Sequence, residues 1–202
     1  MSSEVPFIGL TGAVAAGKSV ALAALERLGA ATLSSDAVVH ELLGTERVRD
    51  LLVGRWGSEV APDGHVDRGK VGAIVFADPE ELTWLEGTLH PLVAERTAAW
   101  RAELPAGAKA AVLEVPLLFE TGMESLFDAT IAIVAPDEVR AERAGARGTS
   151  ELEARSARQL SQEDKAARAT YVVSNTGSIE DLEASLGTIL PDIVATARES
   201  AA

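Results

Sequence analysis

The stretch Phe7-Ile8-Gly9-Leu10-Thr11-Gly12-Ala13-Val14-Ala15-Ala16-Gly17-Lys18-Ser19 decides the fold. It opens on a short apolar run that ends at Thr11-Gly12, which is typical of a buried strand entering a turn. From Lys18 to Leu28 apolar residues recur at helical spacing, and Gly29 follows as a stop signal. The sequence therefore predicts a strand, a glycine-bounded turn and a helix in direct succession.

The turn itself, residues 12–19, matches the pattern G-x-x-x-x-G-K-[ST]. In such a loop the backbone N–H groups surround phosphate oxygens, and the following helix points its positive end at them. Lys18 reaches the β- and γ-phosphates, and the Ser19 hydroxyl can bind Mg²⁺. The alternative is a chance turn rich in glycine and alanine. A strand before the motif and a helix inside it favour the phosphate-binding interpretation.

Further strands alternate with helices along the chain. The apolar runs 110–115 and 129–134 indicate central parallel strands that are buried on both faces. Two shorter strands are predicted at 31–33 and 171–173. Helices are expected at 37–43, at 48–56, from 78 toward 103 with a kink or break at Pro91, at 137–147, at 151–169, and from 178 to 189 with Pro191 as its end and a frayed tail. This alternation predicts an α/β fold with a parallel sheet.

Composition limits the class of protein. The 202 residues include 18 Lys+Arg against 31 Asp+Glu, a formal net charge of −13, and no Cys. Binding to a nucleic-acid backbone rests on clustered Lys and Arg, so this balance argues against a nucleic-acid partner. Without Cys there are no disulfides, thiolate metal sites or Cys nucleophiles. The sequence shows no secretory signal and no run long enough to span a membrane. We therefore expect a cytoplasmic protein with no membrane partner.

Two carboxylates fall at the ends of predicted strands. Glu114 ends an apolar run and could hold Mg²⁺ through water, as a Walker-B-type acid does; capping a helix is the alternative. Asp36 follows the second short strand, and the carboxyl ends of parallel strands line the ligand crevice of such sheets. A carboxylate there could take a proton from an attacking hydroxyl group. The alternative for Asp36 is a helix N-cap.

Basic side chains are concentrated between residues 140 and 168. They are Arg140, Arg143, Arg147, Arg155, Arg158, Lys165 and Arg168. Arg143 and Arg147 are spaced i,i+4 on one helical face, and Arg stabilises the charge that develops on a transferred phosphoryl group. Neighbouring glycines would allow this segment to close as a lid. We expect Arg143 and Arg147 to be functional and most of the others to lie on a solvated helix.

The chain resembles the dephospho-CoA kinases, a family of P-loop kinases, over nearly its whole length. The resemblance rests on a set of short elements in a fixed order. They are Ile8 to Gly12 leading into Gly17-Lys18-Ser19, Ser34-Ser35-Asp36, Asp67-Arg68 with 74–79, Leu89-His90-Pro91-Leu92, 114–122, Phe127-Asp128, Glu142-Arg143 with Arg147, Arg155 with Gln159, and 171–175. The phosphate loop is shared widely, whereas His90-Pro91-Leu92 and the PLLFE-TG element at 116–122 are much more specific.

The resemblance implies ATP-dependent phosphorylation of the ribose 3′-hydroxyl of dephospho-CoA, giving CoA and ADP with Mg²⁺ as cofactor. This reaction is the last step of coenzyme A biosynthesis. The implied architecture is a three-layer P-loop sheet core (1–36, 106–139 and 170–202), a helical substrate-binding region at about 37–105 and a helical lid at about 140–169. Two other functions remain open: a P-loop kinase for another small nucleotide or nucleoside, and a nucleotide-binding protein without catalysis.

The resemblance also implies roles for individual residues. Asp36 would act as the base, and Lys18, Arg143 and Arg147 would act on the transferred phosphoryl group. ATP would be bound by Gly12, Ala15, Ala16, Gly17, Lys18, Ser19, Val20 and Asn175, dephospho-CoA by Asp36, His90, Pro116, Leu117 and Glu120, and Mg²⁺ by Ser19 and Glu114. From the residues alone, by contrast, Leu117, Leu118 and Phe119 are expected to pack into the core.

The chain departs from the family pattern in two places. In the loop, Ala13, Ala15, Ala16 and Val20 stand where the family usually has Gly, Gly, Ser and Thr. An alanine at position 15 would be strained if the loop requires a positive φ there. The segment between Arg147 and Arg155 is also shorter than in the family. Both departures bear on ATP affinity and on closure of the lid.

Overall fold

The computed structural model describes residues 5–145 and 158–200. Contacts within the chain divide it into two compact units, Met1–Ser34 with Leu104–Ala202, and Ser35–Glu103. We call them the sheet unit and the helical unit, and describe each by itself. Across the described ranges, no helix combines the length and apolar character needed to cross a bilayer.

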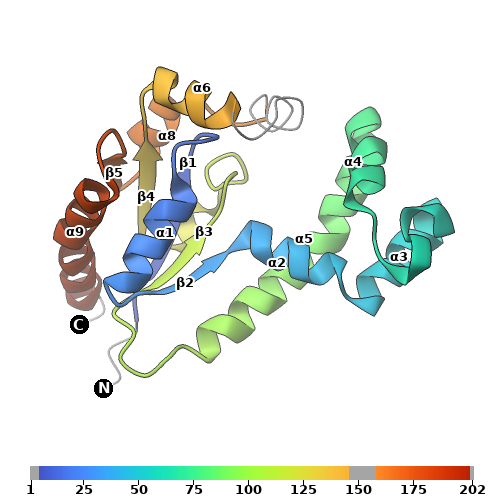
Figure 1. Cartoon of the computed structure of the whole chain (residues 1–202). Coiled ribbons are helices and arrows are strands. Elements are labelled where there is room, and N and C mark those ends of the chain that lie inside the picture. The colour runs from blue at the N-terminus through green and yellow to red at the C-terminus, as the bar shows by residue number, and fades with distance from the viewer. Residues whose placement is uncertain (1–4, 146–157, 201–202) are drawn as a thin grey trace. The chain divides into compact units, whose positions relative to one another are not determined.

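The sheet unit is built on five parallel strands in the order β2-β3-β1-β4-β5 (Figure 1). β1 (Phe7–Gly12) occupies the centre, between β3 (Ala111–Glu114) and β4 (Ala129–Val134), with β2 (Ala31–Ser34) and β5 (Tyr171–Ser174) at the edges. All six residues of β1 are buried. This confirms the expected parallel α/β fold and places the phosphate-loop motif directly after the central strand.

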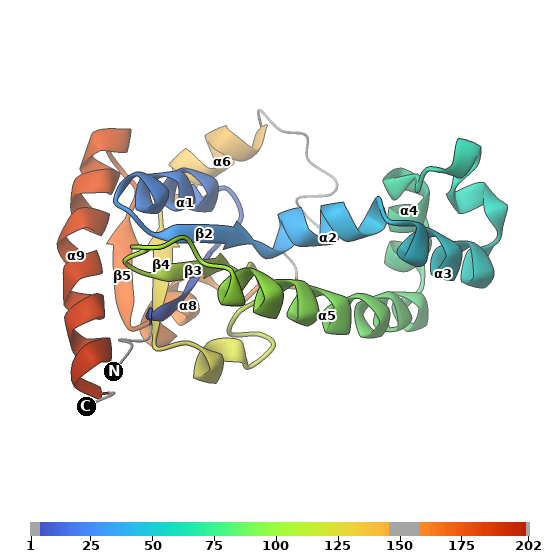
Figure 2. The ribbon, with the colours of Figure 1, turned by 90° about the horizontal axis from the view of Figure 1, so that it is seen from below.

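One face of the sheet carries the main hydrophobic core. Strand residues such as Ile8, Leu10 and Ile131 are fully buried there against α1 (Lys18–Arg27) and α9 (Ile179–Ser200). These two helices lie side by side on that face (Figure 2). Alternate residues of a strand point to opposite faces, so Gly9 faces the other side, where an added Cβ would lie 2.5 Å from Leu118 Cδ1.

The second face is covered by the chain after β3 and by α8 (Gln162–Arg168). Leu118 and Phe119 of the PLLFE element are buried, which confirms a packing role for them, while Leu117 is half-buried. α8 packs against β1 and β4. The remaining elements of this unit are η3 (Met123–Leu126) and α6 (Asp137–Gly145).

The helical unit has a core of its own. It contains α2 (Ser35–Leu43), α3 (Glu46–Trp56), α4 (Arg68–Ala77) and α5 (Pro79–Ala102), with the short 3₁₀ turns η1 (Ser58–Val60) and η2 (Pro62–Gly64). The buried side chains are Val48, Leu52, Val60, Val71, Leu89 and Leu92. The rings of Trp56 and Trp84 pack edge to face with centroids 5.1 Å apart.

The expected helix end at Pro191 is wrong, and the break allowed at Pro91 does not occur. α5 runs without a break through Pro91, and α9 continues through Pro191 to Ser200 instead of ending there. A proline inside a helix costs about 3 kcal/mol. Burial of one Leu or Ile side chain contributes about 1.5–3 kcal/mol. Leu92 in α5 and Ile193 in α9 are buried just beyond each proline, so packing on both sides sustains the helix.

Other differences concern short helices. α4 was not expected, because the turn signals of 57–69 run directly into it. α2 begins at Ser35, so Asp36 lies in the first helical turn and is not the N-cap that spacing alone allowed. Of the helix expected at 151–169, the structure describes only 158–169, of which α8 is helical.

Candidate active site

The phosphate loop connects the end of β1 to the start of α1. Gly12 pairs with Ile133 in the sheet, and a Cβ on Gly12 would lie 2.5 Å from the Ile133 carbonyl oxygen. Gly17 forms the N-cap of α1 with φ +98°, in the left-handed region that favours glycine. Both glycines of the motif are therefore required by this local geometry.

Ala15 has φ 60°. This is the left-handed region, in which an L-residue with a Cβ is strained by roughly 1–2 kcal/mol. The strain expected at this position is therefore present in the structure. Ala13 and Ala16 do not share it, and both are buried. Only one of the alanines in the loop adopts a conformation that favours glycine.

The start of α1 is arranged to receive an anion. No side chain caps it, and its first turn contains no acidic residue. The first N–H groups of a helix lack intrahelical partners and carry a partial positive charge. The Lys18 ammonium donates to the carbonyls of Gly12 at 3.1 Å and Ala13 at 3.3 Å, so its charge lies over the loop. Ser19 follows in the same first turn.

Asn175 supports the loop from the β5 side. Its backbone N–H donates to the Val134 carbonyl at 2.7 Å, and its buried side-chain amide donates to the Ala16 carbonyl at 2.8 Å. A Cβ on Gly17 would lie only 2.0 Å from Asn175 Nδ2. The resemblance placed Asn175 among the ATP contacts; the structure gives its side chain a position against the loop backbone.

Two arginines of α6 lie against the same loop. Arg143 Nη1 is buried, has no hydrogen-bond partner among the described residues, and lies 3.6 Å from where a Cβ on Gly17 would stand. Arg140 donates to the Val14 carbonyl at 3.5 Å and pairs with Asp137 at 2.7 Å. A buried guanidinium N–H without a partner is costly, and an anion in the loop would supply one. Arg147 lies outside the described residues.

Glu114 lies at the end of β3 beside the loop strand. It is opposite Leu10 of β1 and Ser34 of β2, and its Oε2 accepts a hydrogen bond from Ser34 Oγ at 2.6 Å. No group of three or more His, Asp or Glu side chains that could hold a metal occurs among residues 5–145 and 158–200. Mg²⁺ commonly uses one or two carboxylates together with substrate phosphates and water. A hydroxyl at Ser19 and a carboxylate at Glu114 fit that chemistry.

The predicted acceptor-side residues belong to both units. Asp36 and His90 lie in the helical unit, in the first turn of α2 and on α5, and both are exposed. Pro116 and Glu120 follow β3 in the sheet unit.

A buried ammonium group beside the loop was missed by the sequence analysis, which placed Lys165 on a solvated face. The Lys165 side chain is 1% exposed and pairs with Glu120 Oε1 at 2.9 Å. Its Nζ also donates to the Pro116 carbonyl at 2.6 Å and to Thr11 Oγ1 at 3.4 Å. Lys165 thus connects α8 to the end of β1 and to the start of the segment that follows β3. The sequence showed only acidic residues such as Glu163 and Asp164 next to Lys165, which is typical of a solvated helix and did not indicate burial.

The environment of Lys165 is strongly desolvated. Burial lowers its pKa below the ordinary value of 10.5, because the charged form loses water, while Glu120 acts in the opposite direction. Glu120 Oε1 also accepts the Leu160 backbone N–H at 2.7 Å, whereas its Oε2 has no partner among the described residues. The pair fixes the start of α8 beside the phosphate loop.

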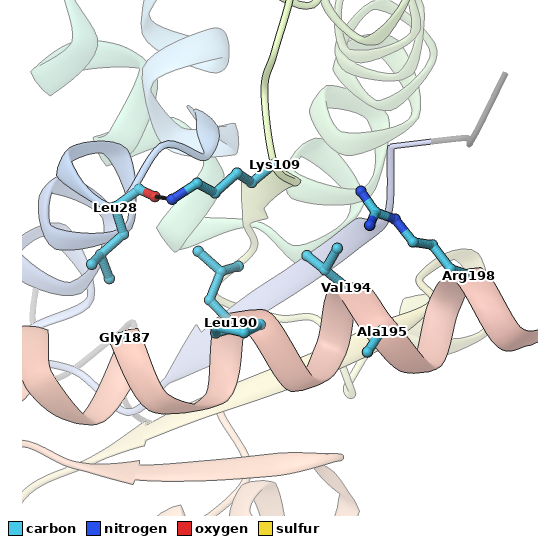
Figure 3. A pocket seen from close by; sticks show the side chains of 8 residues that line it. Leu28, Lys109, Gly187, Leu190, Val194, Ala195 and Arg198 are labelled. Atoms are coloured by element: carbon cyan, nitrogen blue, oxygen red, sulfur yellow. Dashed lines mark hydrogen bonds between the residues drawn. The ribbon is translucent and has the colours of Figure 1, made fainter.

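The apolar cavity of 390 Å³ in the sheet unit is not part of this site. Leu28, Lys109, Leu190, Val194 and Arg198 line it (Figure 3). It opens beside Leu28, at the end of α1 opposite to the phosphate loop. Lys109 Nζ donates to the Leu28 carbonyl there at 2.8 Å.

Comparisons with known proteins agree with this geometry. The family model for dephospho-CoA kinase matches residues 6–181. The chain is 40% identical over 196 residues to the dephospho-CoA kinase of Anaeromyxobacter dehalogenans, covering 92% of this chain and 91% of that protein. A crystal structure from Thermus thermophilus, 36% identical, superposes with a TM-score of 0.80 and covers 94% of this chain and 98% of the other.

A more distant structure shows how widely the fold is shared. Shikimate kinase from Aquifex aeolicus is 16% identical and superposes with a TM-score of 0.52, covering 94% of this chain and 98% of the other. At that identity the likeness concerns the fold alone. The sheet order, the phosphate loop after the central strand and the match over residues 6–181 lead to one conclusion: the chain belongs to the dephospho-CoA kinase family.

Proposed function

We propose that this chain transfers the γ-phosphoryl group of ATP to the ribose 3′-hydroxyl of dephospho-CoA, giving CoA and ADP. This is the last step of coenzyme A biosynthesis. The observation that carries the proposal is the loop 12–19 at the end of the central strand, in a chain that matches the dephospho-CoA kinase family over residues 6–181. The substrate is a small molecule, with no nucleic-acid or membrane partner, and we propose a cytoplasmic location.

The loop and α6 supply the charge stabilisation in this proposal. Backbone N–H groups of 12–19 and the Lys18 ammonium bind the β- and γ-phosphates. Arg143, whose buried Nη1 has no partner among the described residues, donates to the oxygens on which negative charge develops. Arg147 has the same predicted role. Ser19 and Glu114 would hold Mg²⁺, which neutralises charge on the β- and γ-oxygens when bound.

Asp36 is the proposed base. As the 3′ oxygen forms its bond to the γ-phosphorus, the Asp36 carboxylate takes the hydroxyl proton, and the bond to the bridging oxygen breaks to release ADP. Asp36 lies in the first turn of α2, one residue past its start, and not at the N-cap position. His90, Pro116, Leu117 and Glu120 remain the predicted dephospho-CoA contacts. Of the two Glu120 oxygens, Oε2 is the one without a partner among the described residues.

An ADP-release assay with dephospho-CoA, AMP, CMP and adenosine as separate acceptors tests the function. We expect turnover with dephospho-CoA and little with the other three. Lys18→Ala should abolish turnover at unchanged melting temperature, since the side chain lies over the loop. Phosphorylation of AMP, CMP or adenosine with none of dephospho-CoA would contradict the proposal and favour another nucleotide or nucleoside kinase.

Asp36→Asn tests the base. General-base assistance contributes about 10²–10⁴-fold in rate, and a loose phosphoryl-transfer transition state places the expected loss in kcat in the lower half of that range. Glu46→Gln, in the first turn of α3, is the matched control for a first-turn acid in the same unit. Wild-type kcat in Asp36→Asn would mean that the base lies elsewhere.

A further inference from the structure

A small polar cavity in the helical unit gathers basic side chains from three parts of the chain. Its volume is 140 Å³, and its lining includes His40 of α2, Arg49 of α3, and His65 and Arg68 around the start of α4. No Asp or Glu is among the described residues that line it, although Arg49 also pairs with Asp50 at 2.8 Å. In a chain of net charge −13, Arg68 beside His40 and His65 is a local match for an anion. The sequence alone gave no role to His40 or His65, because they are far apart along the chain.

The contacts within the cavity orient these groups. Arg68 Nη1 lies 2.6 Å from His40 Nδ1. Because a guanidinium can only donate, Nδ1 must accept, and the imidazole proton is on Nε2, which is then a donor. His65 Nδ1 lies 3.0 Å from the Asp63 carbonyl, and this contact orients the second ring. Arg68 and His40 are both exposed, so their remaining donors can reach a ligand.

The position of His40 relative to Asp36 fits a nucleotide as the ligand. The two residues are spaced i,i+4 on α2, which puts their Cβ atoms about 5–6 Å apart on one face. That span is close to the length of a ribose from its 3′ oxygen to the phosphorus on its 5′ oxygen. A nucleotide whose 3′-hydroxyl meets Asp36 would therefore bring its 5′ phosphates to His40 and Arg68.

We propose that the cavity lined by His40, Arg49, His65 and Arg68 binds the 5′-diphosphate of dephospho-CoA. This inference rests on the proposed function, in which Asp36 receives the 3′-hydroxyl proton. Arg68 is the main ligand, because a guanidinium matches phosphate oxygens with two parallel hydrogen bonds. The site selects acceptors that carry phosphate groups on the 5′ oxygen over plain nucleosides.

Arg68→Met removes the main ligand, and Arg47→Met is the matched control. Arg47 is also in the helical unit, is 70% exposed and does not line the cavity. A hydrogen bond to a charged group contributes about 10- to 100-fold in binding. We expect Arg68→Met to raise the KM for dephospho-CoA by that factor and to leave the KM for ATP within about twofold. Adenosine lacks the diphosphate, so its kcat/KM should stay unchanged. Arg68→Lys should recover part of the loss.

The result that overturns the subsite is an unchanged KM for dephospho-CoA in Arg68→Met, or an equal fall in kcat/KM for dephospho-CoA and adenosine. If Arg68→Met fails to fold, His40→Gln is read in the same way. Calorimetric titration of dephospho-CoA without ATP separates this failure from failure of the function. Binding that depends on Arg68 without turnover contradicts the kinase assignment and supports the subsite. Turnover of dephospho-CoA together with binding that does not depend on Arg68 supports the kinase assignment and contradicts the subsite.

Discussion

Replacing Ala15 with glycine should stabilise the protein or leave its stability unchanged, although glycine usually destabilises. Ala15 has φ 60°, and relief of that left-handed strain is worth about 1–2 kcal/mol. The glycine makes the unfolded chain more flexible, which costs about 0.4–1 kcal/mol. The expected net change in the free energy of unfolding is a gain between about zero and 1.5 kcal/mol.

Ala16→Gly is the matched control one residue further along the loop. Ala16 is fully buried, and it is not among the described residues with positive φ. The substitution has the same cost in the unfolded state, of about 0.4–1 kcal/mol, and gains no relief of strain. It also removes a buried methyl group, worth about 0.8 kcal/mol. We therefore expect a loss of about 1–2 kcal/mol.

Differential scanning calorimetry of the two variants measures the contrast. For a protein of this length, 1 kcal/mol shifts the melting temperature by about 2–4 °C. The two variants should differ by about 1–3 kcal/mol, with Ala15→Gly the more stable. Because both glycines keep the backbone N–H groups of the loop, ATP should still bind to each. If Ala15→Gly is destabilised as much as Ala16→Gly, the loop is not strained at position 15 and the reasoning fails.

Three other predictions concern the supports of the loop. Asn175→Ala should raise the KM for ATP by about 5- to 10-fold without changing the KM for dephospho-CoA, because the Ala16 carbonyl loses its donor. Steady-state kinetics with each substrate varied measures both constants. If the residue only stabilises the fold, the two KM values should change equally. Glu120→Ala should lower the free energy of unfolding, measured by urea denaturation, by about 3–5 kcal/mol, because it leaves the Lys165 charge buried without its carboxylate. The double variant with Lys165→Met should recover most of this loss. Additive losses would mean that the two side chains are not coupled. Burial lowers the pKa of Lys165, so just below pH 10.5 the unfolded chain binds more protons than the folded one. The free energy of unfolding of wild type relative to Lys165→Met should therefore rise with pH through that alkaline window and level off near pH 10.5. A difference that does not change with pH would contradict the burial of a charged amine.

The phosphate loop could be predicted because its signal is local. The glycines at 12 and 17, Lys18 and the apolar strand before them lie within a short stretch, and the backbone geometry follows from those residues. The strained conformation of Ala15 could also be predicted, because the resemblance places a glycine there. The strands 111–114 and 129–134 were recognisable for a similar reason, since an unbroken apolar run is typical of a strand buried on both faces.

The remaining features depend on packing between distant segments. Pro191 is a helix terminator by local rules, but Ile193 buries itself beyond it and α9 continues. Lys165 reads as a surface charge until the fold brings Glu120 to within 2.9 Å of it. His40 and Arg68 are 28 positions apart, and the sequence contains no signal that the two side chains meet. Such sites follow only from the three-dimensional structure.

The helical unit has a hydrophobic core separate from the one around β1 and α9, and this affects how the protein can lose activity. The sheet unit is held by apolar residues around β1 and α9, and the helical unit by its own set around Val48 and Leu52. Proteins open in cooperative parts whose free energies differ. In mild denaturant the helical unit can therefore unfold while the loop after β1 keeps its place in the sheet unit. Under the proposed function, a molecule in that state would still bind ATP but would lack the proposed base Asp36 and the proposed diphosphate site at Arg68, so it could bind a nucleotide without phosphorylating an acceptor.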